Sequence, residues 1–273
     1  MRFLFWFTLA LLSIAAYFFF FGADQGIQLA SGYFIELALS VDNLVIIYMV
    51  FSSLKVKPED QQRVLFWGIL IAAVARIAFI VGGLELLSHF HFVIYIFAGI
   101  LQLSAFQVLW DWLKGDRAEL EQREGRILGF LKRHLRYDST YKGHAFFISR
   151  DGKLWVTTGF IALILVEISD LIFAVDSVPA VLAVTRDPVI AVLSNILAIF
   201  GLRSLYSLIA KKLESWRFLK PSLVFVLSFV ALKMAAADSF EISALTSLFV
   251  VLATLSVGAL ASWLWPHKKP HRQ

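Results

Sequence analysis

Five carboxylates lie within two apolar segments, each long enough to cross a lipid bilayer. The first segment contains Glu36 and Asp42, and the second contains Glu167, Asp170 and Asp176. A charged side chain at the bilayer centre costs about 3 kcal/mol or more, so it persists only when it is paired, hydrated or bound to an ion. The chain must therefore fold so that these groups face one another or an enclosed polar site.

The composition is that of a membrane protein with several spans. Hydrophobic residues make up 59% of the chain, charged residues make up 16%, and the mean hydropathy is +0.77. A soluble domain has about 25% charged residues. We predict an all-α protein with about eight transmembrane helices, each of about 17–25 residues, which is enough for about 30 Å of hydrocarbon. The spans lie near 3–21, 31–51, 64–87, 92–113, 157–178, 188–210, 221–237 and 242–265.

The first of these segments has two interpretations. It could be a signal peptide that is removed, which would leave seven spans. Its apolar run is longer than that of a signal peptide and no clear Ala-x-Ala site follows it, so a retained helix is favoured.

The positive charges predict the orientation. With the N-terminus inside, 21 of the 25 lysine and arginine residues fall in inside segments, and only Arg186 falls in an outside loop. Cytoplasmic loops of membrane proteins carry such an excess. Both termini and the polar loop 114–156 are therefore predicted to be cytoplasmic. The net charge of +5 follows from these loops and does not indicate nucleic-acid binding.

The two acidic segments belong to a weak internal repeat. Residues 41–43 resemble residues 175–177, and an acidic residue lies six positions before the aspartate in each. The runs 68–76 and 195–203 also match, and both end in arginine. Chance similarity between apolar helices is the alternative explanation. Because the two repeats would have opposite orientations, the pattern is typical of transporters, whose binding site lies near the membrane midplane between the repeats.

The predicted organisation therefore has five parts. A first helix with an outer loop is followed by two inverted three-helix repeats separated by a cytoplasmic loop, and a last helix carries a basic tail. The corresponding ranges are 1–30, 31–113, 114–156, 157–237 and 238–273.

The polar groups inside the spans are oxygen donors, which hard cations such as Mn²⁺, Ca²⁺ and Mg²⁺ prefer. Zinc or copper would more typically draw on histidine or cysteine, and the chain has no cysteine. The candidate cation ligands are Glu36, Asp42, Asn43, Glu167, Asp170 and Asp176. The candidate supporting residues are Ser40, Ser177, Asn195, Arg76, Arg203 and Lys233.

Charge balance favours an ion over simple pairing. The five carboxylates exceed the three cationic side chains within the spans by two, if all are ionised. The alternative is a set of internal salt bridges with no bound ion. A further expectation concerns Pro179, which lacks an N–H group and is predicted to break the helix beside Asp176, because six positions on a straight helix cannot aim Asp170 and Asp176 at one point.

The sequence of the loop 114–156 predicts two local structures. Leu128, Leu131 and Leu135 have helical spacing among basic residues, which predicts an amphipathic helix on the inner leaflet. Residues 145–156 predict a β-hairpin with an Asp-Gly turn. The chain has no phosphate-binding Gly-Lys-Ser/Thr motif and no hydrolase motif, so we expect neither ATP-driven pumping by this chain alone nor enzyme activity.

Three long motifs resemble the TerC family of integral membrane proteins: residues 35–44, 167–180 and 194–206. The resemblance covers about residues 30–265. It implies a protein of the bacterial-type inner membrane, linked to manganese efflux and to tellurium resistance. It also implies metal-site roles for Glu36, Asp42, Asn43, Glu167, Asp170 and Asp176.

Two functions follow as hypotheses. The first is a secondary transporter that exports Mn²⁺, or Ca²⁺ as a second choice, with protons as a candidate coupling ion and no permanently bound cofactor. The second is a membrane scaffold that links metal or tellurium stress to protein partners, whose identity the sequence does not indicate. In either case the lipid bilayer surrounds the chain and nucleic acid is not an expected partner.

Overall fold

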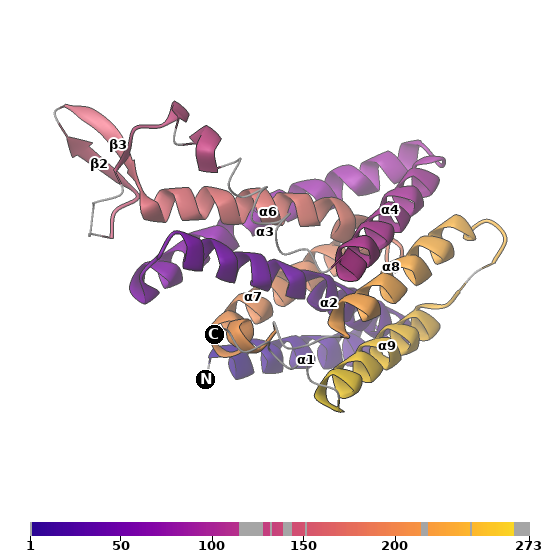
Figure 1. Cartoon of the computed structure of the whole chain (residues 1–273). Coiled ribbons are helices and arrows are strands. Elements are labelled where there is room, and N and C mark those ends of the chain that lie inside the picture. Colours follow the sequence, from indigo (N-terminus) through magenta and orange to yellow (C-terminus); the bar gives the residue numbers. More distant parts are fainter. Residues whose placement is uncertain are drawn as a thin grey trace.

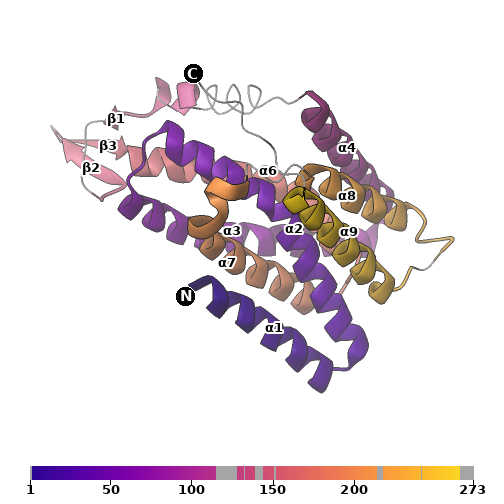
Figure 2. The same ribbon diagram turned by 60° about the horizontal axis from the view of Figure 1, so that its bottom comes forward.

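The computed structural model describes residues 2–114, 128–131, 133–138, 144–150, 152–213, 218–240 and 242–264. Within these ranges, the side chains of residues 2–3, 41–42, 111, 114, 202–205, 207–213 and 219 lie outside the description. Long helices form one bundle, and a small sheet projects from one end of it (Figures 1 and 2). The helices are α1 (Arg2–Phe20), α2 (Ala23–Ser53), α3 (Pro58–His89), α4 (Val93–Lys114), α6 (Thr158–Leu182), α7 (Pro188–Leu213), α8 (Leu219–Ala235) and α9 (Ala244–Leu264).

The helices occupy the ranges that the sequence predicts for membrane spans. Within the described residues, five are long and apolar enough to cross a membrane: α2, α3, α6, α9 and the part Val93–Trp110 of α4. The apolar parts Leu4–Phe20 and Pro188–Gly201 are shorter. The protein is therefore an all-helical membrane protein in its main body, and the count of eight spans stays a prediction.

One face of α3 packs inside the bundle and the other is apolar and exposed. Its buried residues recur every three or four positions: Val64, Gly68, Ala72, Arg76, Ile80, Gly83 and Leu87. The remaining positions expose large apolar side chains, including Phe66, Trp67 and Val74. Soluble monomers rarely expose apolar patches of more than a few hundred Å². The exposed face of α3 is suited to lipid.

The centre of the bundle is built from both halves of the chain. Helices α2 and α3 from the first half each pack against α6 and α7 from the second half, and α4 packs against α8. Two hydrophobic clusters lie above and below the middle of these helices. One contains Ile80 and Val178, and the other contains Val64 and Val166. The polar residues of the spans lie between them.

The polar loop contains a small three-stranded β-sheet beside the otherwise helical body. Strand β2 (Phe147–Arg150) pairs antiparallel with β3 (Lys153–Thr157), so the predicted hairpin is confirmed. Gly152 in its turn has a φ of 68°, which glycine adopts readily. Strand β1 (Tyr137–Asp138) pairs in parallel with β3 and was not predicted. The sheet order is β1-β3-β2.

The leucines of the same loop pack on the protein. Leu128, Leu131 and Leu135 contact the hydrophobic cluster that contains Val64 and Val166. Their apolar face therefore rests at least partly on the bundle, where the sequence predicts the inner leaflet of the membrane.

The predicted break at Pro179 is wrong. Helix α6 continues through Pro179 to Leu182, where the N–H of Ala183 donates to the carbonyl oxygen of Pro179. Because proline has no N–H, residue 179 does not donate to the carbonyl oxygen of Val175, but the helix continues around this missing bond. Helix α2 is also continuous past Gly32 and Ser40.

Candidate cation site

Arg76 lies near the middle of α3 with only 2% of its surface exposed, and four polar side chains surround its guanidinium group. Its Nη1 atom is paired with Oε1 of Glu36. The same Nη1 donates to Ser177 Oγ at 2.8 Å and to Asn195 Oδ1 at 3.0 Å. Its Nη2 atom lies 3.4 Å from Oδ1 of Asp170. Helices α2, α6 and α7 thus meet α3 at this arginine.

Two further side chains of α2 complete the network. Ser40 Oγ donates to Glu36 Oε1 at 2.8 Å, and Asn43 Nδ2 donates to Asp170 Oδ1 at 2.6 Å. We call the set the Arg76 cluster: Glu36, Ser40, Asn43, Arg76, Asp170, Ser177 and Asn195, all of them buried.

Helical periodicity explains how the chain places these groups. Glu36, Ser40 and Asn43 are four and three positions apart, so they lie along one face of α2. Asp170 and Ser177 are seven positions apart and share one face of α6. Helix α6 packs directly against α3, whereas α2 packs against α6 and α7, and Glu36 reaches Arg76 through its side chain.

Several buried polar atoms of this region have no hydrogen-bond partner. Two are acceptors, Glu36 Oε2 and Asn43 Oδ1, and two others are Arg76 Nε and the hydroxyl of Tyr33. An unsatisfied buried polar group costs about 1–3 kcal/mol, and more when it is charged. Unpartnered carboxylate and amide oxygens are suited to a cation.

The carboxylates of the region outnumber the arginine. Glu167 is buried on α6, one turn before Asp170 and on the same face. Among the described side chains of this region, Glu36, Glu167 and Asp170 carry three negative charges and Arg76 carries one positive charge, if all are ionised. Within the described residues, no three side chains of histidine, cysteine, aspartate or glutamate form a metal-binding group. A cation here would therefore also need amide or hydroxyl oxygens.

Two predicted residues lie apart from the Arg76 cluster. Asp176 is half-buried and faces α4, where it accepts a hydrogen bond of 2.6 Å from Ser104. Lys233 of α8 donates to Ser247 of α9 at 2.7 Å. Because α6 is continuous from Asp170 to Asp176, regular helix geometry places Asp176 about 240° around the helix from Asp170. The predicted roles of Asp42 and Arg203 fall on side chains outside the described part of the structure.

Comparison with known proteins identifies the family. Residues 21–270 match the family described as "Integral membrane protein TerC family". The chain belongs to this family. It is 38% identical to the Myxococcus xanthus membrane protein STKORF319, over 97% of this chain and 82% of that protein. It is 37% identical to the Escherichia coli K12 protein named "Putative membrane-bound redox modulator Alx", over 92% of this chain and 79% of that protein. A Salmonella typhi protein of the same name is 36% identical over 92% of this chain and 80% of that protein. No solved structure matches the chain significantly.

Sequence reasoning did not single out Tyr33, a buried polar residue of α2. Its side chain is fully buried, and its hydroxyl lies 3.6 Å from the position that a Cβ atom would take at Gly201. It lies three residues before Glu36, as Glu167 lies three residues before Asp170, so the predicted repeat extended by one turn would have pointed to it.

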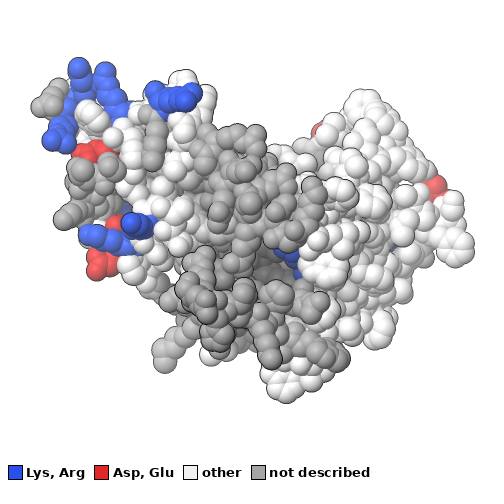
Figure 3. All heavy atoms as spheres, in the orientation of Figure 1, with Lys and Arg blue, Asp and Glu red and all other residues white. Residues whose placement is uncertain are grey.

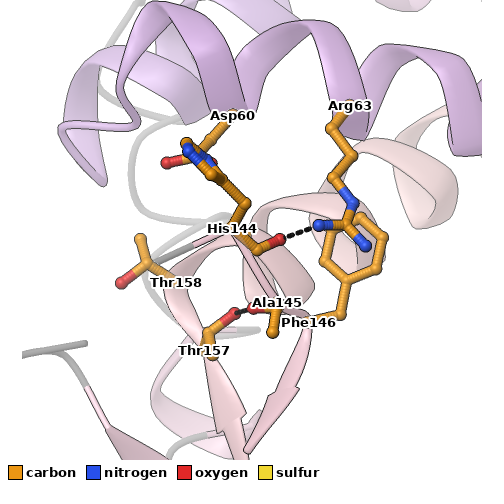
Figure 4. Close-up of a pocket in the computed structure, with 8 residues that line it drawn as sticks. Asp60, Arg63, His144, Ala145, Phe146, Thr157 and Thr158 are labelled. Carbon is orange, nitrogen blue, oxygen red and sulfur yellow. Dashed lines mark hydrogen bonds and ion pairs between the residues drawn. The ribbon is translucent and has the colours of Figure 1, made fainter. Parts of the chain in front are cut away.

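A separate contact joins the hairpin to α3 in this TerC-family protein (Figure 4). His144 Nδ1 lies 2.7 Å from Asp60 Oδ1, and Arg63 donates to the carbonyl oxygen of His144. Arg63 also lies over the ring of Phe146, 4.9 Å from its centroid. These contacts hold the hairpin against the first turns of α3, at the end of the bundle far from Arg76.

Proposed function

We propose that the chain is a secondary transporter that exports a hard divalent cation through the Arg76 cluster. The oxygen ligands of the cluster match Mn²⁺ better than zinc. The observation that carries the proposal is the pair of buried acceptors that have no partner among the described residues, Glu36 Oε2 and Asn43 Oδ1, beside the Asp170 carboxylate at the centre of a membrane bundle. Carboxylate, amide and hydroxyl oxygens are the ligands that Mn²⁺, Ca²⁺ and Mg²⁺ prefer.

The proposed ligands have different support. Glu36, Asn43 and Asp170 converge on one place and are the first choice, and Glu167 lies on the same face of α6 as Asp170. Asp42 remains a proposed ligand on the basis of the sequence pattern. Asp176, which the same pattern predicts as a ligand, faces Ser104 in this structure and is left out of the proposed site. Ser40, Ser177 and Asn195 offer additional oxygens next to Glu36.

The pairing of helices supports an inverted repeat. If α2, α3 and α4 correspond to α6, α7 and α8, a two-fold axis relates the α2–α7 pair to the α3–α6 pair and relates α4 to α8. Each of these pairs packs together in the bundle. Glu36 and Asp170, which are repeat mates, both pair with Arg76. A site shared by two repeats is where alternating access places the substrate.

The distribution of charge supports an orientation with the hairpin in the cytoplasm of a bacterial-type inner membrane. On the face shown in Figure 3, lysine and arginine side chains gather at the end of the molecule that carries β2 and β3. An excess of positive charge marks the cytoplasmic side. Because the chain has no cysteine, Ser149→Cys on β2 and Ser239→Cys after α8 are suitable single-cysteine probes. An impermeant reagent applied to intact cells should label Ser239→Cys alone, and labelling of Ser149→Cys alone would reverse the orientation.

Export requires a driving force. Moving two positive charges outward against 100 mV, inside negative, costs about 4.6 kcal/mol. Exchange of one Mn²⁺ for two protons would be electroneutral, and carboxylates of the spans are groups that could carry protons inward. We therefore propose proton exchange as the coupling.

The decisive experiment is flux of radioactive Mn²⁺ in proteoliposomes that contain the purified protein. We expect flux above that of empty liposomes, acceleration by a proton gradient, and competition by Ca²⁺ and Mg²⁺ more than by Zn²⁺. Asp24→Asn, at an exposed position of α2, is the matched control for substitutions of buried aspartates. Absence of flux from protein that is folded and correctly inserted would contradict the proposal.

A membrane scaffold is the second candidate, and one observation favours it. Strand β2 is an edge of the small sheet and is mostly exposed, so it offers backbone groups and basic side chains to a partner. The name of the Escherichia coli relative refers to redox modulation, but the 273 residues of this chain contain no thiol. Charge reversal at Arg150 and Lys153 separates the two candidates. A scaffold should lose its metal- or tellurium-stress phenotype, whereas a transporter should keep its Mn²⁺ flux.

A further inference from the structure

The Nη1 atom of Arg76 has more oxygen neighbours than it has hydrogens to donate. A guanidinium Nη atom carries two N–H bonds. Glu36 Oε1, Ser177 Oγ and Asn195 Oδ1 all lie within hydrogen-bonding reach of it. They come from α2, α6 and α7 and comprise one carboxylate, one hydroxyl and one amide oxygen. This is the ligand chemistry of a hard dication.

The rest of the guanidinium group is weakly held. Its Nε atom is buried without a partner, and its Nη2 contact to Asp170 is long, at 3.4 Å. An arginine whose only task is to fix a structure usually binds its carboxylate through two short parallel bonds. Most of the polar contacts of Arg76 are therefore made by its Nη1 atom.

We propose that Arg76 is a tethered competitor of the transported ion: Nη1 occupies the ion's place in the empty protein, and the arriving dication displaces it. This inference rests on the proposed function. It explains how buried carboxylates remain stable in the membrane between transport events, because a buried charge left without a partner is strongly destabilising.

The structure also offers the displaced group a second position. Asp170 already lies beside Nη2, and its carboxylate has two oxygens. A shift of the guanidinium toward Asp170 would open the place beside Glu36, Ser177 and Asn195 to the ion, while one oxygen of Asp170 and the Asn43 amide stay available to the ion as proposed ligands. The charge of Arg76 would stay balanced by Asp170 throughout.

The test is Mn²⁺ binding to purified Arg76→Gln, with Lys233→Gln as the matched control. Both changes remove one cation from a membrane helix, but Lys233 contacts Ser247 and lies outside the Arg76 cluster. We expect Arg76→Gln to bind Mn²⁺ at least tenfold more tightly than the original protein, and to transport it more slowly because release is hindered. Lys233→Gln should bind as the original does. Unchanged or weaker binding by folded Arg76→Gln would overturn the inference.

A second variant covers the case in which Arg76→Gln does not fold. Ser177→Ala removes one oxygen beside Nη1 and keeps every charge. If the ion takes the place of Nη1, Ser177 is one of its ligands, so the loss of this oxygen should lower Mn²⁺ affinity about tenfold. Unchanged affinity would mean that the ion binds elsewhere and Arg76 is not displaced.

The original protein separates this inference from the proposed function. If it neither binds nor transports Mn²⁺, the proposed function fails and the inference fails with it. If it does both and the two variants behave against expectation, only the inference fails.

Discussion

Asp170 and Asp176 lie six residues apart on the same helix, yet they belong to different regions of the protein. Asp170 is buried between α2 and α3 and contacts Arg76 and Asn43. Asp176 is half-buried on the side of α4, where its carboxylate accepts a hydrogen bond from the hydroxyl of Ser104. The first lies in a network of charges shared by both halves of the chain. Asp176, in contrast, faces the hydroxyl of Ser104 on α4. The surroundings of a carboxylate, more than its presence in an acidic motif, decide what it can bind.

The two described cations of the spans show the same contrast. Arg76 lies between two carboxylates, whereas Lys233 donates to the hydroxyl of Ser247. Binding and displacement of an ion are therefore expected in the region of Arg76 and Asp170, and not in the region of Asp176 or of Lys233.

The largest expected effect is that of Asp170→Asn. This change leaves Arg76 with one carboxylate partner and removes a proposed ligand, so Mn²⁺ affinity should fall at least thirtyfold. Breaking a buried ion pair costs about 3–5 kcal/mol, so the thermal unfolding temperature should fall as well. Equilibrium binding and thermal unfolding of purified protein measure the two effects, with Asp24→Asn as the control. Normal binding by Asp170→Asn would remove the distinction between the two regions.

A smaller loss of Mn²⁺ affinity is expected for Asn43→Leu, which keeps the approximate size of the side chain. It removes the 2.6 Å hydrogen bond to Asp170 and the unpartnered oxygen. A hydrogen bond to a charged group contributes about 1.5–3 kcal/mol, which corresponds to about a tenfold or greater loss of Mn²⁺ affinity. Titration of the purified variant with Mn²⁺ measures it. An affinity equal to that of the original protein would show that Asn43 only supports the helix packing.

Asp176→Asn should change Mn²⁺ affinity by less than about threefold, because in this structure its carboxylate faces Ser104 and not the Arg76 cluster. Ser104→Ala is its partner variant and should behave in the same way. Binding is again the measurement, with flux recorded separately. A loss as large as that of Asp170→Asn would place Asp176 in the cation site in another state of the protein.

The smallest effect is expected at the hairpin. His144→Ala removes the exposed contact to Asp60, and exposed ion pairs contribute about 0–1 kcal/mol. The thermal unfolding temperature should therefore fall only slightly, and Mn²⁺ affinity should not change. A marked change in affinity would mean that the position of the hairpin on α3 is coupled to the site.

The sequence by itself determined the class of the protein, the ranges of its helices and the faces on which the polar groups lie. Apolar length and mean hydropathy indicate membrane helices, because lipid leaves a backbone no other partner for its hydrogen bonds. The spacing of Glu36, Ser40 and Asn43, and of Asp170 and Ser177, fixes one face of each helix, because these are local properties of 3.6 residues per turn. The hairpin was also predictable, since its turn residues are local.

Only the tertiary structure decided which faces meet. Arg76 contacts Asn195 because α7 packs against α3, and it contacts Glu36 because α2 packs against both α6 and α7 beside α3. The sequence separations of 40 and 119 residues carry no record of these contacts. Asp176 faces α4 instead, since α6 remains a continuous helix through Pro179. The sequence placed six acids and amides on helices, and the packing of distant helices selected which of them share a site.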